Sequence, residues 1–250
     1  MIRFFILSLG ALGLVACGSW ATVETEKAEL HLRMGTSLLE GGSYPQALSE
    51  LLTAEQLDPS HPVTQNNLGL VYFARGKNDL AETHIRKALH LNPNYTDAKI
   101  NLGRILIEQE KYVEADHTLE QAAQDLTYPA PEKPLLNLGL SSFRQKKFKG
   151  AKDYLSKSLD FQRNSCLAQT LYGRSVYELK DYAAAASSLD LAIGFCRHEQ
   201  ADEPQYYSAM AYFQSGDQQK AETRLNEIIK IYPNGRYRDR ARSLLETMRK

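Results

Sequence analysis

Small and large apolar residues recur along this chain with a period of 34 to 36 residues. One position of each period holds a small residue, and these are Gly35, Gly69, Gly103, Gly139, Gly173 and Ala209. Twelve and sixteen residues later follow an alanine (Ala47, Ala81, Ala115, Ala151, Ala185, Ala221) and a large aliphatic residue (Leu51, Ile85, Leu119, Leu155, Leu189, Leu225). Because residues four apart share a helix face and small residues let two helices approach closely, this pattern predicts repeated pairs of antiparallel helices.

Turn and helix-ending residues recur in the same register. Aromatic residues mark the turn between two helices at Tyr44, Tyr112, Phe148 and Tyr182, and prolines end repeats at Pro59, Pro93 and Pro233. Over residues 28–235 the pattern resembles the tetratricopeptide repeat family. The resemblance implies an all-α fold, a right-handed superhelix (α-solenoid) of six helix-turn-helix repeats.

The expected repeats cover residues 28–61, 62–95, 96–131, 132–165, 166–201 and 202–235. Residues 236–250 predict one more helix, with Ala241, Leu244, Leu245 and Met248 on one face. This helix would cap the last repeat, because the end of a solenoid otherwise exposes apolar surface. Its arginines are interpreted as a solvated face, with a docking patch for an acidic partner as the alternative.

The first sixteen residues have the pattern of a cleaved secretory signal peptide. Arg3 precedes an apolar stretch, Phe4 to Ala16, that is too short to span a bilayer. Leu14-Val15-Ala16-Cys17 matches the bacterial lipobox, so we expect cleavage after residue 16 and lipidation of Cys17. An ordinary signal peptide with an incidental cysteine is the alternative.

Lipidation would give Cys17 an N-acyl and an S-diacylglycerol group, and several acyl chains anchor a protein stably. Residues 17–27 would then be the lipidated N-terminus and spacer. No Asp follows the cysteine, since Gly18 and Ser19 come next, which favours sorting to the outer membrane. We therefore expect a lipid-anchored, periplasm-facing protein of a Gram-negative bacterium.

Two further cysteines, Cys166 and Cys196, lie at the first position of the fifth repeat and just beyond its second helix. Antiparallel helices would bring these positions to the same end of the pair. In a secreted chain this favours a disulfide, with two buried thiols as the alternative.

Composition and missing motifs exclude several classes of function. Of 250 residues, 43% are hydrophobic, and 30 Lys and Arg balance 30 Asp and Glu, unlike a polybasic nucleic-acid binder or an acidic disordered chain. The sequence lacks the G-x-S-x-G, H-E-x-x-H, phosphate-loop and dinucleotide patterns, and its six histidines lack metal-ligand spacing. We expect no enzymatic activity, no catalytic residue, no metal and no cofactor other than the lipid on Cys17.

The first helices of tetratricopeptide repeats line a concave surface, which predicts a partner-binding groove. The expected lining is Leu32, Leu39, Asn67, Leu70, Phe73, Ile100, Asn101, Ile107, Leu136, Asn137, Leu140 and Phe143, continued by Tyr177, Tyr206, Met210 and Phe213. Such an apolar lining suits an amphipathic helix or an apolar segment, although about half of these side chains would equally suit a core. Asn67, Asn101 and Asn137 would either bind the main chain of a peptide or satisfy helix ends.

The signal peptide, lipobox, repeats and closing helix together resemble the type IV pilus biogenesis lipoproteins of the PilF/PilW/Tgl pilotin family. The resemblance implies a non-catalytic monomer whose groove holds a segment of the pilus secretin, while the lipid anchor directs the complex to the outer membrane for multimer assembly. Residues 231–237 with Ala241 and Leu244 also resemble lipoproteins of β-barrel assembly and of Tol-Pal coordination. A scaffold of those machineries, or an adaptor for a peptidoglycan hydrolase, is the alternative.

Overall fold

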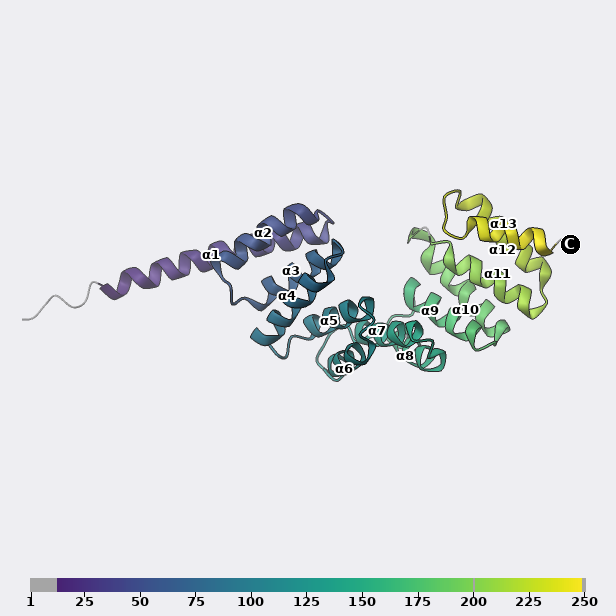
Figure 1. Cartoon of the computed structure of the whole chain (residues 1–250), viewed down its shortest axis with the longest axis horizontal. Coiled ribbons are helices and arrows are strands. Elements are labelled where there is room, and N and C mark those ends of the chain that lie inside the picture. The colour runs from purple at the N-terminus through teal and green to yellow at the C-terminus, as the bar shows by residue number, and fades with distance from the viewer. Residues whose placement is uncertain (1–12, 200, 249–250) are drawn as a thin grey trace, which may run out of the picture. The chain divides into compact units, whose positions relative to one another are not determined.

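The computed structural model of the chain describes residues 13–199 and 201–248, which form thirteen α-helices and no strand (Figure 1). The helices are α1 (Gly13–Glu40), α2 (Tyr44–Leu57), α3 (Pro62–Ala74), α4 (Asn78–Leu91), α5 (Thr96–Glu108), α6 (Tyr112–Ala123), α7 (Glu132–Arg144), α8 (Phe148–Phe161), α9 (Cys166–Glu178), α10 (Tyr182–Phe195), α11 (Glu203–Ser215), α12 (Gln218–Ile231) and α13 (Arg238–Met248), with a short 3₁₀ helix η1 (Cys196–Glu199) after α10. The predicted all-α fold class is confirmed.

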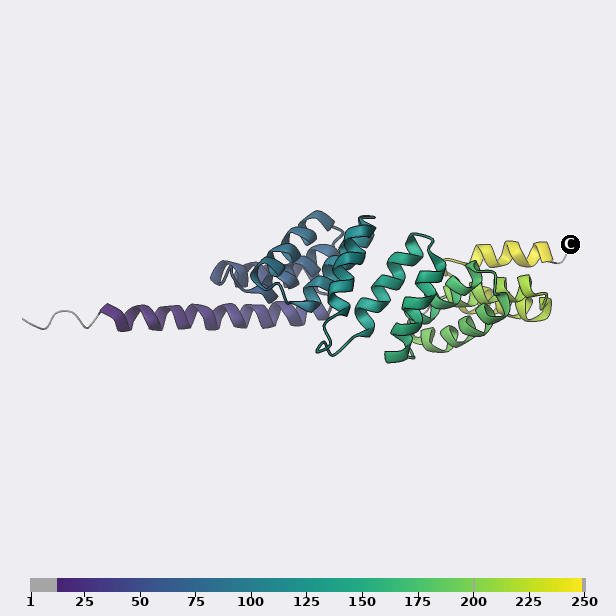
Figure 2. The ribbon, with the colours of Figure 1, turned by 90° about the horizontal axis from the view of Figure 1, so that it is seen from below.

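The chain divides into two compact units, Met1–Gln109 and Glu110–Lys250. In the first unit α1 packs on α2 and α3 on α4, and in the second α7 packs on α8, α9 on α10 and α11 on α12. The helices of each pair run antiparallel (Figures 1 and 2). The division lies between α5 and α6, inside the segment expected to form the third repeat.

In four of the pairs, a close contact between backbone and side chain joins the two helices. A Cβ atom added to the glycine of the first helix would lie 2.6 to 2.7 Å from an aliphatic carbon of the second helix. The pairs are Gly35–Leu51, Gly69–Ile85, Gly139–Leu155 and Gly173–Leu189, and all four aliphatic residues are fully buried. In these four pairs the helices pack at a distance that leaves no room for a side chain at the glycine, whereas Ala209 occupies the corresponding position of α11 and packs with the buried Leu225 of α12.

A residue with left-handed backbone conformation lies in the turn between two paired helices or just before a second helix. These residues are Gly42, Gly76, Glu110, Lys146, Lys180 and Gly216, with φ between 59° and 89°. They recur at the same 34- and 36-residue spacings as the buried glycines. Three of the six are not glycine, and a side chain in this backbone region costs conformational energy. The turn geometry is therefore the same in all six turns, even where glycine is absent.

Cys166 at the start of α9 and Cys196 just after α10 form a disulfide, with their Cα atoms 4.9 Å apart. The bond closes the open end of this helix pair. In the chain-entropy account, a cross-link over a sequence separation of 30 residues contributes about 3 to 4 kcal/mol to stability.

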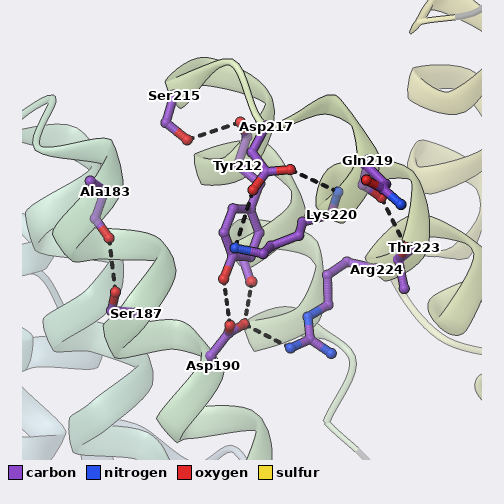
Figure 3. A network of polar contacts seen from close by, with 11 residues as sticks. Ala183, Ser187, Asp190, Tyr212, Ser215, Asp217, Gln219, Lys220, Thr223 and Arg224 are labelled. Atoms are coloured by element: carbon purple, nitrogen blue, oxygen red, sulfur yellow. Dashed lines mark hydrogen bonds and ion pairs between the residues drawn. The ribbon is translucent and has the colours of Figure 1, made fainter.

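Asp190 of α10 connects three consecutive helices of the second unit (Figure 3). Its carboxylate accepts hydrogen bonds from the Ser208 and Tyr212 hydroxyls of α11, each at 2.7 Å, and from the Arg224 guanidinium of α12 at 3.0 Å. Arg224 also pairs with Glu227 at 2.8 Å. Burial and the hydrogen bond to Asp190 raise the pKa of Tyr212 to about 12, because both favour the neutral phenol.

Helix α1 runs without interruption from Gly13 to Glu40, so the expected spacer 17–27 is helical. Its N-terminal half extends beyond the other helices of the first unit (Figure 2). Residues 1–12 of the expected signal peptide, and the Cys17 side chain, lie outside what the structure describes. Within the described part of the chain, none of the helices combines the length and apolar character needed to cross a bilayer.

We predict that Gly173→Ala destabilises the protein while Gly194→Ala does not. The added methyl group meets Leu189 at 2.7 Å in the first variant and nothing within 4 Å in the second. Because both changes raise helix propensity equally, their unfolding free energies should differ by about 1 to 3 kcal/mol through overpacking alone. Urea unfolding followed by circular dichroism measures this difference, and equal stabilities would show that the close contact is not a constraint.

We also predict that the second unit loses stability in alkali as Tyr212 ionises. Because the folded state raises the pKa of Tyr212 from 10.0 to about 12, its contribution is complete below pH 10 and is lost as the pH rises through about 12. Unfolding free energies measured across this range should fall more steeply for the wild type than for Tyr212→Phe. Parallel curves would rule out this role of the Tyr212–Asp190 hydrogen bond.

Candidate functional site

The predicted groove residues divide between buried and half-buried positions. Leu32, Asn67, Ile100, Ile107 and Asn137 are buried, whereas Leu39, Leu70, Phe73, Asn101, Leu136, Leu140 and Phe143 are half-buried, as are Tyr177, Tyr206, Met210 and Phe213. Leu32 belongs to the core cluster that contains Leu51 and Leu68. Ile100 and Ile107 are 4% and 2% exposed. Ile100 and Ile107 pack in the core and offer a partner almost no surface, which corrects the prediction at these two positions, whereas Leu32, also in the core, lines the hollow beside α1 described below.

The asparagines of the first unit bind one another and a threonine. Asn67 Nδ2 donates to Thr36 Oγ1 of α1 at 2.8 Å, Asn66 Nδ2 donates to Asn67 Oδ1 at 3.1 Å, and Asn101 Nδ2 of α5 donates to Asn66 Oδ1 at 2.9 Å. This chain of amides connects the first helices α1, α3 and α5. In the second unit Asn137 Nδ2 instead donates to the Lys133 carbonyl within α7, at 2.8 Å. These hydrogen bonds give the asparagines a structural role.

A second polar cluster joins α2, α3 and α4. Glu55 Oε1 accepts hydrogen bonds from Gln65 and Lys87, each at 2.8 Å, and Gln65 Oε1 lies 2.9 Å from His84 Nδ1. Burial lowers the pKa of His84. Burial alone would raise the pKa of Glu55, but the hydrogen bonds from Lys87 and Gln65 outweigh this effect, and the pKa of Glu55 is lowered as well. The cluster therefore holds a neutral imidazole beside an ion pair, as a structural link between repeats.

The accessible apolar residues of the predicted groove in the first unit lie on α1 and α3. Leu70 and Phe73 are half-buried on α3, and the guanidinium carbon of Arg104 on α5 lies 5.5 Å from the centre of the Phe73 ring. A cation over a ring face is weakly attractive and leaves the ring edge open. This surface combines apolar contact with one positive charge.

A hollow of about 980 Å³ lies beside the N-terminal half of α1. Val23 and Leu30 of α1 line one side, and Asp58, His61 and Thr64, near the connection from α2 to α3, line the other. Val23 and Leu30 are each 48% exposed, so the hollow presents two large aliphatic side chains to solvent. The volume lies in the upper part of the range found for binding pockets.

In the second unit Arg174 connects three successive first helices. Its guanidinium carbon lies 4.6 Å from the ring centre of Phe143 on α7 and 4.3 Å from that of Tyr207 on α11, and it forms an ion pair with Glu203 of α11. The planar guanidinium can stack on both rings while its edge meets the carboxylate. Arg174 and Tyr207 occupy the ninth and sixth positions of their repeats, which are groove positions, but a search for apolar residues alone overlooks the arginine and its partners.

Tyrosines extend this contact to the last helix. The Tyr237 ring stacks on Tyr206 at a centroid distance of 4.8 Å and meets Tyr207 edge to face at 5.9 Å, and Tyr207 contacts Tyr177 at 6.0 Å. Burial raises the pKa of Tyr177 and Tyr206, and burial together with the Glu203 charge raises that of Tyr237 to about 12. At neutral pH these phenols are uncharged, so the tyrosines contact one another as neutral rings.

The chemistry of both units is that of a protein-binding surface. Within residues 13–199 and 201–248 there is no group of three or more His, Cys, Asp and Glu side chains that could hold a metal ion. The side chains that converge in the clusters described above are aliphatic, aromatic and amide groups, together with the ion pairs of Glu55 with Lys87 and of Arg174 with Glu203 and the imidazole of His84.

Comparison with known proteins agrees with this description. Tetratricopeptide repeat models match residues 62–95 and 205–235, and a TPR repeat model matches residues 35–76. Human DnaJ homolog subfamily C member 3 is 26% identical over 215 residues, which are 86% of this chain but 37% of that protein.

Two solved structures share the fold over most of this chain. The Pseudomonas aeruginosa PilF structure matches with a TM-score of 0.77 at 26% sequence identity. The match covers 88% of this chain and 99% of the PilF chain. The crystal structure of PilW, a widely conserved type IV pilus biogenesis factor, has a TM-score of 0.78 at 20% identity and covers 89% and 98%.

The family follows from the sequence comparison. The chain is 31% identical over 192 residues to the type IV pilus assembly protein PilF of Pseudomonas aeruginosa strain PAO1. The aligned residues are 75% of this chain and 76% of PilF. Sequence, repeat architecture and fold agree, and this chain therefore belongs to the family of tetratricopeptide-repeat type IV pilus assembly proteins that includes PilF.

Proposed function

We propose that this protein is a pilotin: it binds the type IV pilus secretin and promotes its localisation and multimer assembly in the outer membrane. Membership of a pilus assembly family and a fold that binds protein partners support the proposal. The role requires no catalysis, only a surface that holds an apolar secretin segment before the segment is buried in the membrane or the multimer.

The hollow beside α1 is the observation that carries the proposal. Its aliphatic residues Val23 and Leu30 are half exposed, and its open volume of about 980 Å³ suits one apolar helix or extended segment. Covering the exposed parts of two such side chains would contribute roughly 1 to 3 kcal/mol. The half-buried Leu70 and Phe73 on α3 provide a second apolar surface in the same unit.

The lipid anchor would place this hollow next to the membrane. Cys17, the proposed lipidated residue, precedes Val23 by six residues on the same continuous helix. At a rise of 1.5 Å per residue this separation is about 9 Å. A segment bound there would be held within about one helix diameter of the outer membrane, where it would insert.

We predict that Leu30→Asp strongly weakens secretin capture and that Leu80→Asp does not. The two leucines are 48% and 47% exposed on helices of the first unit, but only Leu30 lines the hollow. A carboxylate in the apolar interface should reduce the binding free energy by about 2 to 3 kcal/mol, which raises the dissociation constant for purified secretin about 30- to 150-fold. Heat-resistant secretin multimers in the bacterium should decline in parallel.

Circular dichroism of both variants checks that the helices are retained. Equal capture by Leu30→Asp and the wild type would refute the role of the hollow, and Phe73→Asp then tests the groove on α3. Normal secretin multimers without the protein would refute the pilotin function itself, and a general loss of outer-membrane β-barrels would favour the β-barrel assembly alternative.

We further predict that the anchor is needed for secretin assembly and not for secretin binding. Replacing residues 1–17 with the signal peptide of a non-lipidated periplasmic protein should leave the dissociation constant unchanged within about twofold. Secretin multimers in the outer-membrane fraction should nevertheless be lost, because the bound segment is no longer carried to the membrane. Mass spectrometry of the wild-type N-terminal peptide reports the acyl groups, and an unmodified Cys17 would disprove lipidation.

A further inference from the structure

A hollow of about 440 Å³ lies between α11 and α13 in the second unit. It is lined by Tyr206, Asp239, Arg240, Ser243, Leu244 and Thr247. Tyr206 and Leu244 are half-buried and form an apolar part, whereas Arg240, Ser243 and Thr247 are exposed and polar. A site with one apolar contact and several hydrogen-bonding groups around it resembles a pocket for a peptide side chain and its adjacent main chain.

Positive charge concentrates at this place in a chain of zero net charge. Within the described residues 236–248, four basic residues accompany two acidic ones. Arg236 and Arg240 are exposed, and among the described residues neither has a carboxylate within ion-pair distance. Arg240 lines the hollow and Arg236 lies over the same Tyr237 ring, and two unpaired guanidinium groups beside one ring favour an anionic ligand.

The two arginines are held in place by an aromatic ring. Each guanidinium carbon lies 5.5 Å from the centre of the Tyr237 ring, which is itself 3% exposed. Tyr237 is fixed by its stacking on Tyr206 and by its backbone N–H, which donates to the buried Asp202 carboxylate at 2.7 Å. Arginines stacked in this way lose less side-chain entropy when their N–H groups bind a carboxylate.

We infer that this hollow binds an acidic peptide segment of a partner protein. Carboxylates of the segment pair with Arg236 and Arg240, an apolar or aromatic side chain enters between Tyr206 and Leu244, and the Ser243 and Thr247 hydroxyls bind its main chain. Asp239 in the lining disfavours a uniformly anionic lipid surface but can accept a peptide N–H. The site is formed by the second unit alone and does not depend on secretin binding at α1.

Fluorescence anisotropy with a labelled synthetic peptide that alternates Glu and Phe tests this inference on the full mature protein. Arg240→Gln should weaken binding at least tenfold. Arg242→Gln removes the same charge from an exposed position on the same helix that does not line the hollow, and it should change binding less than twofold. The matched peptide with Gln in place of Glu should also bind at least tenfold more weakly.

Equal losses in the two arginine variants would overturn the inference, since binding would then follow net charge alone. Equal binding of the Glu and Gln peptides, or no saturable binding of the Glu peptide, would also overturn it. Vesicles containing phosphatidylglycerol provide the remaining comparison: if they bind in an Arg240-dependent manner and the Glu peptide does not, the surface contacts membrane and not protein. Circular dichroism confirms that each variant retains its helices.

Discussion

Four of the helix pairs depend on the contact between a glycine of the first helix and a buried aliphatic residue of the second. At Gly35, Gly69, Gly139 and Gly173 an added Cβ would lie within 2.7 Å of the facing side chain. This distance determines how closely the two helices pack, and therefore which residues of the first helix remain at the surface. Leu30 is exposed and Phe73 is half-buried on the first helices of their pairs, whereas Ile107 is buried.

Polar contacts between successive first helices add the second level of order. The amide chain through Asn66 and Asn67 connects first helices in one unit, and Arg174, stacked between two rings, connects them in the other. Buried polar groups are stabilising only when they are satisfied, so these residues are committed to the scaffold. What remains accessible is an apolar hollow at α1 and a cationic, tyrosine-lined hollow at α13, which suits a scaffold with two different ligands.

Much of this arrangement follows from periodicity, because the fold is built from local helix pairs. Spacing alone predicted the paired helices and placed Cys166 near Cys196, which the structure joins in a disulfide. Spacing did not reveal the left-handed turn positions, since Lys146 and Lys180 occupy two of them without glycine. Spacing also did not show whether Ile100 belongs to the core or to the groove, because apolar residues occur at both kinds of position. The α1 hollow and the Arg174 contacts could not be predicted, since they depend on how residues about thirty positions apart meet in space.

In the proposed function, the exposed apolar side of α1 holds the secretin. Site-specific photo-crosslinking in living cells tests it most directly, with a photoreactive amino acid introduced at Leu30 and, as the control, at the equally exposed Leu80. The account predicts a crosslink from position 30 to one apolar secretin segment, identified by mass spectrometry, and none from position 80. Secretin crosslinks of equal yield at both positions, or none at position 30, would contradict it.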